Sequence, residues 1–140
     1  MSERPIRLRG LDHIVLRVVD VERSKRFYCD VLGCSLERTL EKLGLYQLRA
    51  GAQLIDLVDV AAPLGQAGGA AAGEHGRNVD HFALQVSPFD ATAICAWLEA
   101  HGVEVGEVAA RYGAEGIGPS MYISDPDGNT VELKGPPTGD

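Results

Sequence analysis

The sequence predicts an α+β fold made of two related halves, and three observations support this prediction. A short Asp-His motif followed by alternating apolar residues occurs twice, at 12–18 and at 80–86. A helical pattern follows each motif, and short β-like runs follow each helix. Because an internal duplication sets the architecture before any local feature does, we expect each half to contain a strand, a helix and then several strands.

The first half, 8–60, begins with the strand 12–18, whose alternation is typical of a half-buried strand. Asp20 can cap the helix that follows, and Gly33 can end it. Two β-like runs, 45–49 and 53–60, complete this half. The apolar positions that share one face of the predicted helix are Phe27, Tyr28, Val31 and Leu32.

The second half, 79–135, repeats this order. Its strand at 80–86 precedes a helix that either Pro88 or Asp90 can open, with Ile94, Trp97 and Leu98 on one face and Gly102 after it. Two runs at 120–124 and 130–134 follow. The Asp-Pro-Asp-Gly-Asn segment between them predicts a hairpin turn, since proline fixes φ and glycine or asparagine accepts a left-handed conformation.

The segment 61–78, between the halves, is rich in glycine and alanine. It has too few large apolar residues to form an element of its own, so we predict a flexible linker, with a lid over a site as the alternative. The chain as a whole, 1–140, is 45% hydrophobic and 24% charged, which predicts one compact domain.

The charge and the apolar runs restrict the partners and the location of the protein. A formal net charge of −7 disfavours nucleic acid and anionic membranes as partners. No apolar run approaches the roughly 20 residues that cross a bilayer, and the first ten residues do not resemble a signal peptide, so we expect a cytoplasmic location. Three cysteines without CxxC spacing suggest neither disulfides nor a zinc cluster.

Four residues at matching positions of the two halves could bind one divalent metal. His13 and His81 are equivalent in the first strands, and Asp56 and Glu132 are equivalent in the last strands, each between apolar neighbours. Imidazole nitrogen and carboxylate oxygen suit metals of intermediate hardness, and a buried carboxylate needs a partner such as a cation. The sequence therefore predicts a metal site formed by these four side chains.

Two stretches carry a family resemblance that covers nearly the whole chain. Asp-His-Ile-Val-Leu-Arg-Val with the following Asp-Val-Glu-Arg-Ser-Lys-Arg-Phe-Tyr-Cys-Asp-Val-Leu-Gly, and the terminal Ser-Asp-Pro-Asp-Gly-Asn-Thr-Val-Glu-Leu, resemble the vicinal oxygen chelate superfamily of glyoxalases, fosfomycin-resistance proteins and extradiol dioxygenases. The resemblance implies two βαβββ modules that form a curved mixed sheet around a metal cavity. The implied ligands are His13, Asp56, His81 and Glu132, although glyoxalase I proteins usually have Glu where this chain has Asp56.

The activity that the resemblance implies is that of a metal-dependent glyoxalase-like lyase or isomerase. Such an enzyme holds vicinal oxygens of a small substrate at one divalent metal, here Ni, Co, Zn, Mn or Fe, and stabilises an enolate-like intermediate. Glu132 is the first candidate for the catalytic base and Asp56 the second. The family also implies a homodimer, with the modules pairing either within one chain or between two.

Three residues are candidates for substrate binding. Arg17, on the strand face of His13, is similar to the glyoxalase arginine that contacts the glutathione carboxylate, but Val60 stands where that pattern has an asparagine. Ser120 and Tyr122 alternate along the penultimate strand, so their hydroxyls could face the cavity, as at the phosphonate site of fosfomycin-resistance enzymes. Those enzymes have a catalytic threonine where this chain has Val15.

Three other functions stay open at this point. Two histidines and one carboxylate would suit an extradiol-type Fe(II) dioxygenase. A fosfomycin-type thiol transferase is the second alternative, and a metal-free drug-binding resistance protein, related to bleomycin-resistance proteins, is the third. His75 and His101 have no counterpart in the other half, and we interpret them as surface residues.

Overall fold

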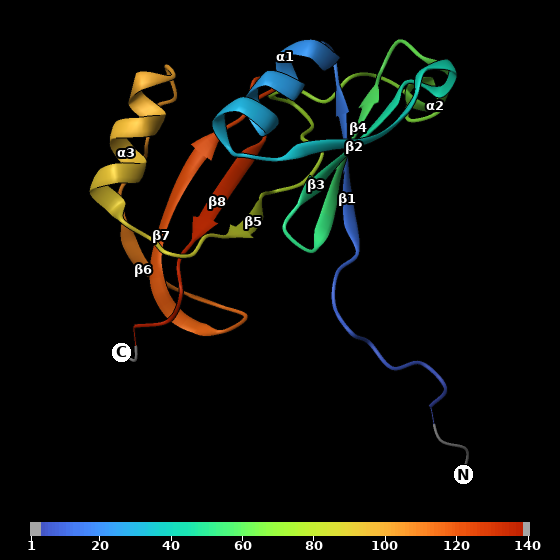
Figure 1. The fold of residues 1–140 in the computed structure, drawn as a ribbon. Coiled ribbons are helices and arrows are strands. Elements are labelled where there is room, and N and C mark those ends of the chain that lie inside the picture. The colour runs from blue at the N-terminus through green and yellow to red at the C-terminus, as the bar shows by residue number, and fades with distance from the viewer. Residues whose placement is uncertain (1–3, 139–140) are drawn as a thin grey trace.

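Two four-stranded mixed sheets form the framework of the protein, whose computed structural model describes residues 4–138. The strand order is β1-β4-β3-β2 in the first sheet and β5-β8-β7-β6 in the second. In each sheet the first strand of the module pairs in parallel with the last, and the other pairs are antiparallel. The predicted α+β fold of two modules is therefore confirmed, with the strands divided between two separate sheets (Figure 1).

Both modules follow the order βαβββ. The first contains β1 (His13–Val18), α1 (Val21–Lys25), the π-helix η1 (Arg26–Val31), β2 (Ser35–Leu40), the 3₁₀ turn η2 (Glu41–Leu43), β3 (Leu45–Ala50) and β4 (Gln53–Asp59). The second contains β5 (Phe82–Gln85), α3 (Ala91–Ala100), β6 (Ala109–Gly113), β7 (Gly116–Ser124) and β8 (Thr130–Lys134). The short helix α2 (Pro63–Gln66) lies between them. Among the described residues, no helix has the length and apolar character needed to span a bilayer.

The helices begin where the sequence predicts. The Asp20 carboxylate accepts a hydrogen bond from the Arg23 backbone N–H at 3.1 Å, and Asp90 accepts one from Ala93 at the same distance. These caps satisfy backbone donors that the first helical turn leaves free. Asp90, rather than Pro88, is therefore the cap of α3. Gly33 follows the first helical segment with a φ of +90°, a conformation that favours glycine.

Besides the 3₁₀ turn η2, three elements were not predicted. β2 is an edge strand exposed along most of its length, and β6 has the sequence Ala-Ala-Arg-Tyr-Gly, so neither shows a strong apolar alternation. The linker prediction was wrong at α2, which starts with Pro63 in its first turn. α2 packs by close backbone approach: a Cβ at Gly65 would lie only 1.9 Å from the Asp59 carbonyl oxygen. Such an approach needs no large apolar side chain.

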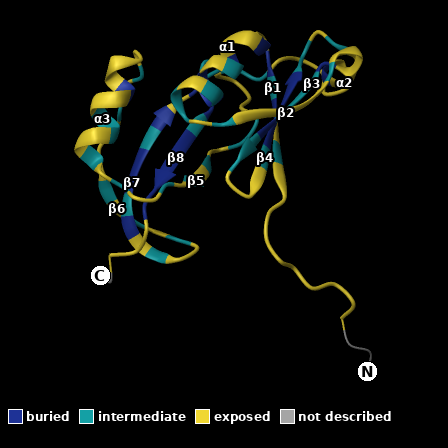
Figure 2. Ribbon diagram, viewed as in Figure 1, coloured by how far each residue is buried: buried dark blue, intermediate teal, exposed yellow. Residues whose placement is uncertain are grey.

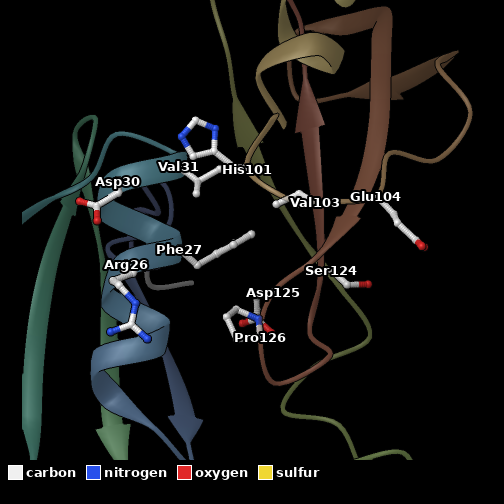
Figure 3. A pocket seen from close by; sticks show the side chains of 11 residues that line it. Arg26, Phe27, Asp30, Val31, His101, Val103, Glu104, Ser124, Asp125 and Pro126 are labelled. Carbon is white, nitrogen blue, oxygen red and sulfur yellow. The ribbon is translucent and has the colours of Figure 1, made fainter. Parts of the chain in front are cut away.

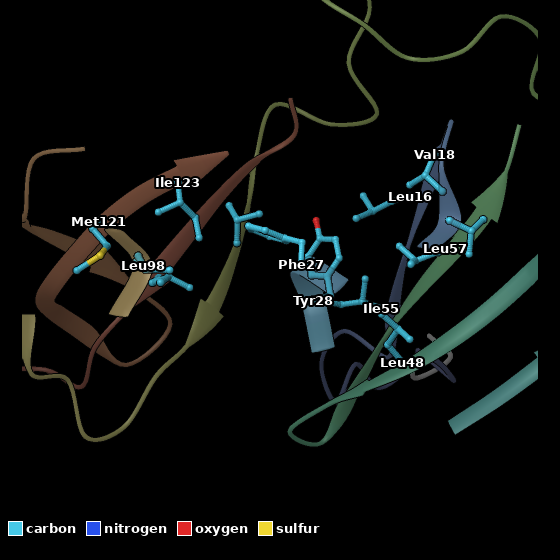
Figure 4. Packing of buried hydrophobic residues seen from close by; sticks show 13 residues of the cluster. Leu16, Val18, Phe27, Tyr28, Leu48, Ile55, Leu57, Leu98, Met121 and Ile123 are labelled. Carbon is cyan, nitrogen blue, oxygen red and sulfur yellow. The ribbon is translucent and has the colours of Figure 1, made fainter. Parts of the chain in front are cut away.

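The core lies between the two sheets and is filled from both modules. Figure 4 shows Phe27 and Tyr28 between residues of the first sheet and residues of the second, and Figure 2 shows that the facing parts of the strands are buried. Tyr28 is fully buried. The first sheet contributes Leu16, Val18, Leu48, Ile55 and Leu57, and the second module contributes Leu98, Met121, Ile123, Val131 and Leu133.

The predicted β7–β8 turn of the second module forms hydrogen bonds with the first helical segment and with Val19, which precedes it. The Tyr28 hydroxyl donates to Asp125 Oδ2 at 2.6 Å, and Asp127 accepts hydrogen bonds from the Val19 N–H and the Ser24 hydroxyl. Burial, followed by the charge of Asp125, raises the pKa of Tyr28 well above its usual value. The turn thus joins the modules through polar contacts, of which the Tyr28–Asp125 hydrogen bond is buried, in addition to the apolar core.

Candidate functional site

The first module places His13 and Asp56 on one face of its sheet. β1 and β4 are parallel with Val15 opposite Asp56, and side chains of alternate residues share a face, so His13 and Asp56 point the same way. His13 Nε2 lies 4.0 Å from Asp56 Oδ2, and the Gln47 side-chain amide donates to the same oxygen at 3.2 Å. Asp56 is 4% exposed, and its Oδ1 is buried without a hydrogen-bond partner.

The second module repeats this arrangement with His81 and Glu132. His81 Nε2 lies 3.4 Å from Glu132 Oε1, and the Ser120 hydroxyl donates to Glu132 Oε2 at 2.8 Å. Glu132 is 7% exposed, and Ser120 is fully buried. We call each His–carboxylate pair a half-site: His13 with Asp56 is the first, and His81 with Glu132 the second.

Each histidine also contacts the aspartate that precedes it. Asp12 Oδ2 lies 2.7 Å from His13 Nδ1, and Asp80 Oδ2 lies 2.6 Å from His81 Nδ1. The hydrogen bond to Asp12, with a further contribution from Asp56, raises the pKa of His13. In both half-sites, therefore, Nδ1 faces an exposed carboxylate and Nε2 faces a buried one.

Two more side chains flank the second half-site. The Tyr122 ring meets the His81 ring edge to face, with 5.5 Å between centroids, and the Arg111 guanidinium carbon lies 4.5 Å from the centre of the Tyr122 ring. Arg111 also donates to the carbonyl and hydroxyl oxygens of Ser120. Arg111 was not predicted as a site residue, because its strand β6 was not predicted.

The four predicted metal ligands come together as two pairs. No group of three or more His, Cys, Asp or Glu side chains between residues 4 and 138 is close enough to hold a metal ion. In Figure 1, β1 and β4 lie in one sheet, whereas β5 and β8 lie in the other. One chain by itself therefore presents two separate half-sites.

Arg17 is bound to the linker. Its guanidinium donates to the backbone carbonyls of Gly65, Gly69 and Ala70, and its Nε is buried without a hydrogen-bond partner. A Cβ at Gly68 would lie 2.4 Å from that Nε. The linker therefore follows the end of β1 closely, at the opposite end of the strand from His13.

A hollow of about 570 Å³ lies at the seam between the modules, apart from both half-sites. Figure 3 shows η1 on one side of it, with the segment after α3 and the end of β7 on the other. None of its lining residues is a predicted site residue. The hollow is lined by Arg26, Phe27, Asp30, Val31, His101, Gly102, Val103, Glu104, Ser124, Asp125 and Pro126.

Two βαβββ modules, each with a His–carboxylate pair on one face of its sheet, define the class of protein as a duplicated fold with one half-site per repeat. The model of the Glyoxalase/Bleomycin resistance protein/Dioxygenase superfamily matches residues 10–133. The chain belongs to this superfamily, as the resemblance of its motifs implied.

One curated relative and several solved structures agree with this assignment. A lactoylglutathione lyase from Haemophilus influenzae is 32% identical over 132 residues, which cover 86% of this chain and 88% of the relative. The virulence protein STM3117 from Salmonella typhimurium matches with a TM-score of 0.76 and 26% identity, over 94% of this chain and all of that one.

Fosfomycin resistance protein FosX from Listeria monocytogenes has the same fold. One crystal form matches with a TM-score of 0.69 and 22% identity, over 91% of each chain. A second FosX structure, complexed with Mn(II) and sulfate, matches with a TM-score of 0.68 and 20% identity over 94% of each chain.

Proposed function

We propose that this protein is a divalent-metal enzyme of glyoxalase type, a lyase or isomerase acting on a small substrate with two neighbouring oxygens. The observation that carries this proposal is the repeated half-site, in which Nε2 of a histidine faces a buried carboxylate in both modules. The lactoylglutathione lyase name of the Haemophilus influenzae relative supports the same type of reaction.

The residues of the half-sites fit a divalent metal. Asp56 is buried, and its Oδ1 has no hydrogen-bond partner, which is unfavourable for a carboxylate unless a cation binds there. Two imidazole nitrogens and two carboxylates form a donor set that suits Ni, Co, Zn, Mn or Fe. His13, Asp56, His81 and Glu132 would hold the ion, with Asp56 the ligand in greatest need of a test.

The four ligands require two copies of the chain in this proposal. Each copy contributes its first half-site to one metal and its second half-site to the other, so a two-fold dimer has two equivalent sites. The His13 and His81 side chains are 44% and 37% exposed, and Val15, on the same sheet face as His13, is 46% exposed. These open sheet faces leave room for a second copy of the chain. The location that we propose for the homodimer is cytoplasmic.

A bound metal would supply a Lewis acid that stabilises negative charge developing on a substrate oxygen. Glu132 is the proposed base that takes a proton from the substrate, and Asp56 is the second candidate. Ser120 donates to Glu132 Oε2, which fixes the carboxylate while Oε1 faces His81. Tyr122 and Arg111, next to His81, are proposed to contact the substrate. Arg17 can do so only if the linker carbonyls release it.

Metal analysis of the purified protein tests the site. We expect about one bound divalent ion per chain, and its loss in both His13→Ala and Glu132→Ala, because each variant lacks one of the four side chains that would hold the ion. A protein that binds none of the five metals, by elemental analysis and by metal-dependent melting, would contradict the proposal.

The reaction is tested separately with the metal-loaded protein. Formation of S-lactoylglutathione, the compound in the relative's name, would establish a glyoxalase reaction. Metal binding without this product would leave the metal site standing but contradict a lactoylglutathione lyase activity, in which case metal-dependent turnover of other small oxygenated substrates decides the reaction. Oxygen uptake with catechols under Fe(II) loading would instead identify a dioxygenase.

A further inference from the structure

The aspartates that precede the two histidines share one geometry. Asp12 Oδ2 is 2.7 Å from His13 Nδ1, and Asp80 Oδ2 is 2.6 Å from His81 Nδ1. Both aspartate side chains are largely exposed, at 90% and 96%. Asp12 and Asp80 belong to different modules, so the chain makes the same contact twice, at equivalent positions of its duplication.

The contact determines which imidazole nitrogen is available. An ionised carboxylate only accepts hydrogen bonds, so a ring nitrogen at this distance carries the proton. In a neutral imidazole the other nitrogen then has a free lone pair. That other nitrogen is Nε2, which faces Asp56 in the first half-site and Glu132 in the second.

We propose that Asp12 and Asp80 are positioning residues of the candidate metal site, holding His13 and His81 with Nδ1 protonated and Nε2 directed at the ion. This inference rests on the function proposed above. Without the aspartate, a neutral imidazole populates both tautomers, and the ring can also rotate by half a turn about its bond to Cβ. A carboxylate on the outer nitrogen of a metal-binding histidine removes both freedoms and makes the ring a stronger donor.

The exposure of the aspartates separates this role from a role in folding. An ion pair or hydrogen bond in open water contributes little to stability, because solvent competes for both partners. Replacing Asp12 or Asp80 should therefore leave the melting temperature of the metal-free protein nearly unchanged. The effect should appear in metal binding.

Titration of the metal-free, full-length protein with Co(II) tests the inference. We expect Asp12→Asn and Asp80→Asn each to weaken Co(II) binding by about 10-fold or more, the usual effect of removing such an outer partner. Both should also change the visible absorption of bound Co(II), which reports ligand geometry. The control is Asp30→Asn, which makes the same charge change at an exposed aspartate of η1. Wild-type affinity and spectrum in Asp12→Asn and Asp80→Asn would overturn the inference.

Nitrogen NMR of the imidazoles, without metal and above the pH at which histidines are protonated, gives a second reading. We expect wild-type His13 and His81 to carry the proton on Nδ1, and each Asn variant to lose this preference at its own histidine only. If the wild type shows this tautomer but binds no Co(II), the proposed function fails and the positioning stands. If the wild type binds Co(II) and the tautomer populations of His13 and His81 are unchanged in the Asn variants, the positioning role of the aspartates fails and the proposed function stands.

Discussion

The two half-sites differ most at their carboxylates. Glu132 has a hydrogen bond from Ser120 on one oxygen and His81 at 3.4 Å from the other. Asp56, shorter by one methylene, has Gln47 and a more distant His13 on one oxygen, and no partner on the other. The first half-site is therefore the less satisfied of the two in the absence of a cation.

Asp56→Asn should have opposite effects on stability and on metal binding. Removing a buried, incompletely paired charge should stabilise the metal-free protein by about 1–2 kcal/mol. The same change should abolish most of the rise in melting temperature that metal produces, because stabilisation by a ligand depends on its affinity. Thermal denaturation of the wild type and the variant, each with and without Co(II), measures both effects. Lower stability of the metal-free Asp56→Asn variant would instead show that the Asp56 carboxylate stabilises the folded protein.

The sequence predicted which site residues of the two modules correspond, and it predicted Ser120 and Tyr122 beside them, but it did not predict Gln47 and Arg111. The duplication identified His13 with His81 and Asp56 with Glu132, since equivalent strand positions point to equivalent faces. Gln47 and Arg111 were missed because contacts across strands depend on register. A sequence without structure does not show which residue of β3 or β6 lies beside the site.

The segment 61–78 is more ordered than its composition suggests. Besides α2, it contains three carbonyls that bind the Arg17 guanidinium, and Asn78 exchanges hydrogen bonds with the Arg17 backbone. Gly68 passes so close to Arg17 that any larger residue would overlap it. Tertiary contacts, those with Arg17 among them, therefore hold the linker in place without local apolar burial.

Gly68→Ala should loosen the linker. Its Cβ would displace the Arg17 guanidinium from the linker carbonyls, and because these hydrogen bonds are exposed or only partly buried we expect a loss of about 0.5–1.5 kcal/mol. We expect faster proteolysis within the linker and a lower melting temperature. Gly73→Ala is the matched control, because a Cβ there meets nothing within 4 Å and its φ is not in the left-handed region. Equal proteolysis of both variants would argue against the role of Arg17.

Elements with strong local signals were the ones predicted correctly. The caps at Asp20 and Asp90, the strands β4 and β8 and the turn 125–129 each have local sequence signals that act over a few residues. β2 and β6 have none, because β2 is exposed along most of its length and β6 lacks a run of alternating large apolar residues. Each pairs antiparallel with a neighbour in its sheet, β2 with β3 and β6 with β7.

Tyr28 connects the two modules by a hydrogen bond that depends on the protonation of its hydroxyl. Tyr28→Phe leaves the buried Asp125 without this donor, so we expect a loss of about 1–3 kcal/mol at neutral pH. The raised pKa of Tyr28 contributes stability that is complete below about 10, the usual pKa of tyrosine, and is lost as pH rises toward the folded-state pKa.

The stability difference between wild type and Tyr28→Phe should therefore shrink in alkaline solution. Urea denaturation of both proteins across the alkaline range measures this, and the comparison cancels the other titrating groups. A difference that stays constant with pH would show that Tyr28 ionises as easily in the folded protein as in the unfolded one.

The separation of the half-sites within a chain leads to a test of how two chains combine. His13→Ala damages only the first half-site, and His81→Ala only the second, so each variant alone should have no complete metal site. If a site joins the first half-site of one copy to the second of its partner, a mixed dimer contains one intact site and one that lacks both histidines. Random pairing of co-expressed variants should then restore about a quarter of the wild-type sites, since half of all two-fold dimers are mixed. Tight Co(II) binding at that level would establish a shared site. If two affinity tags demonstrate mixed dimers but no tight Co(II) binding is restored, each chain forms a metal site of its own.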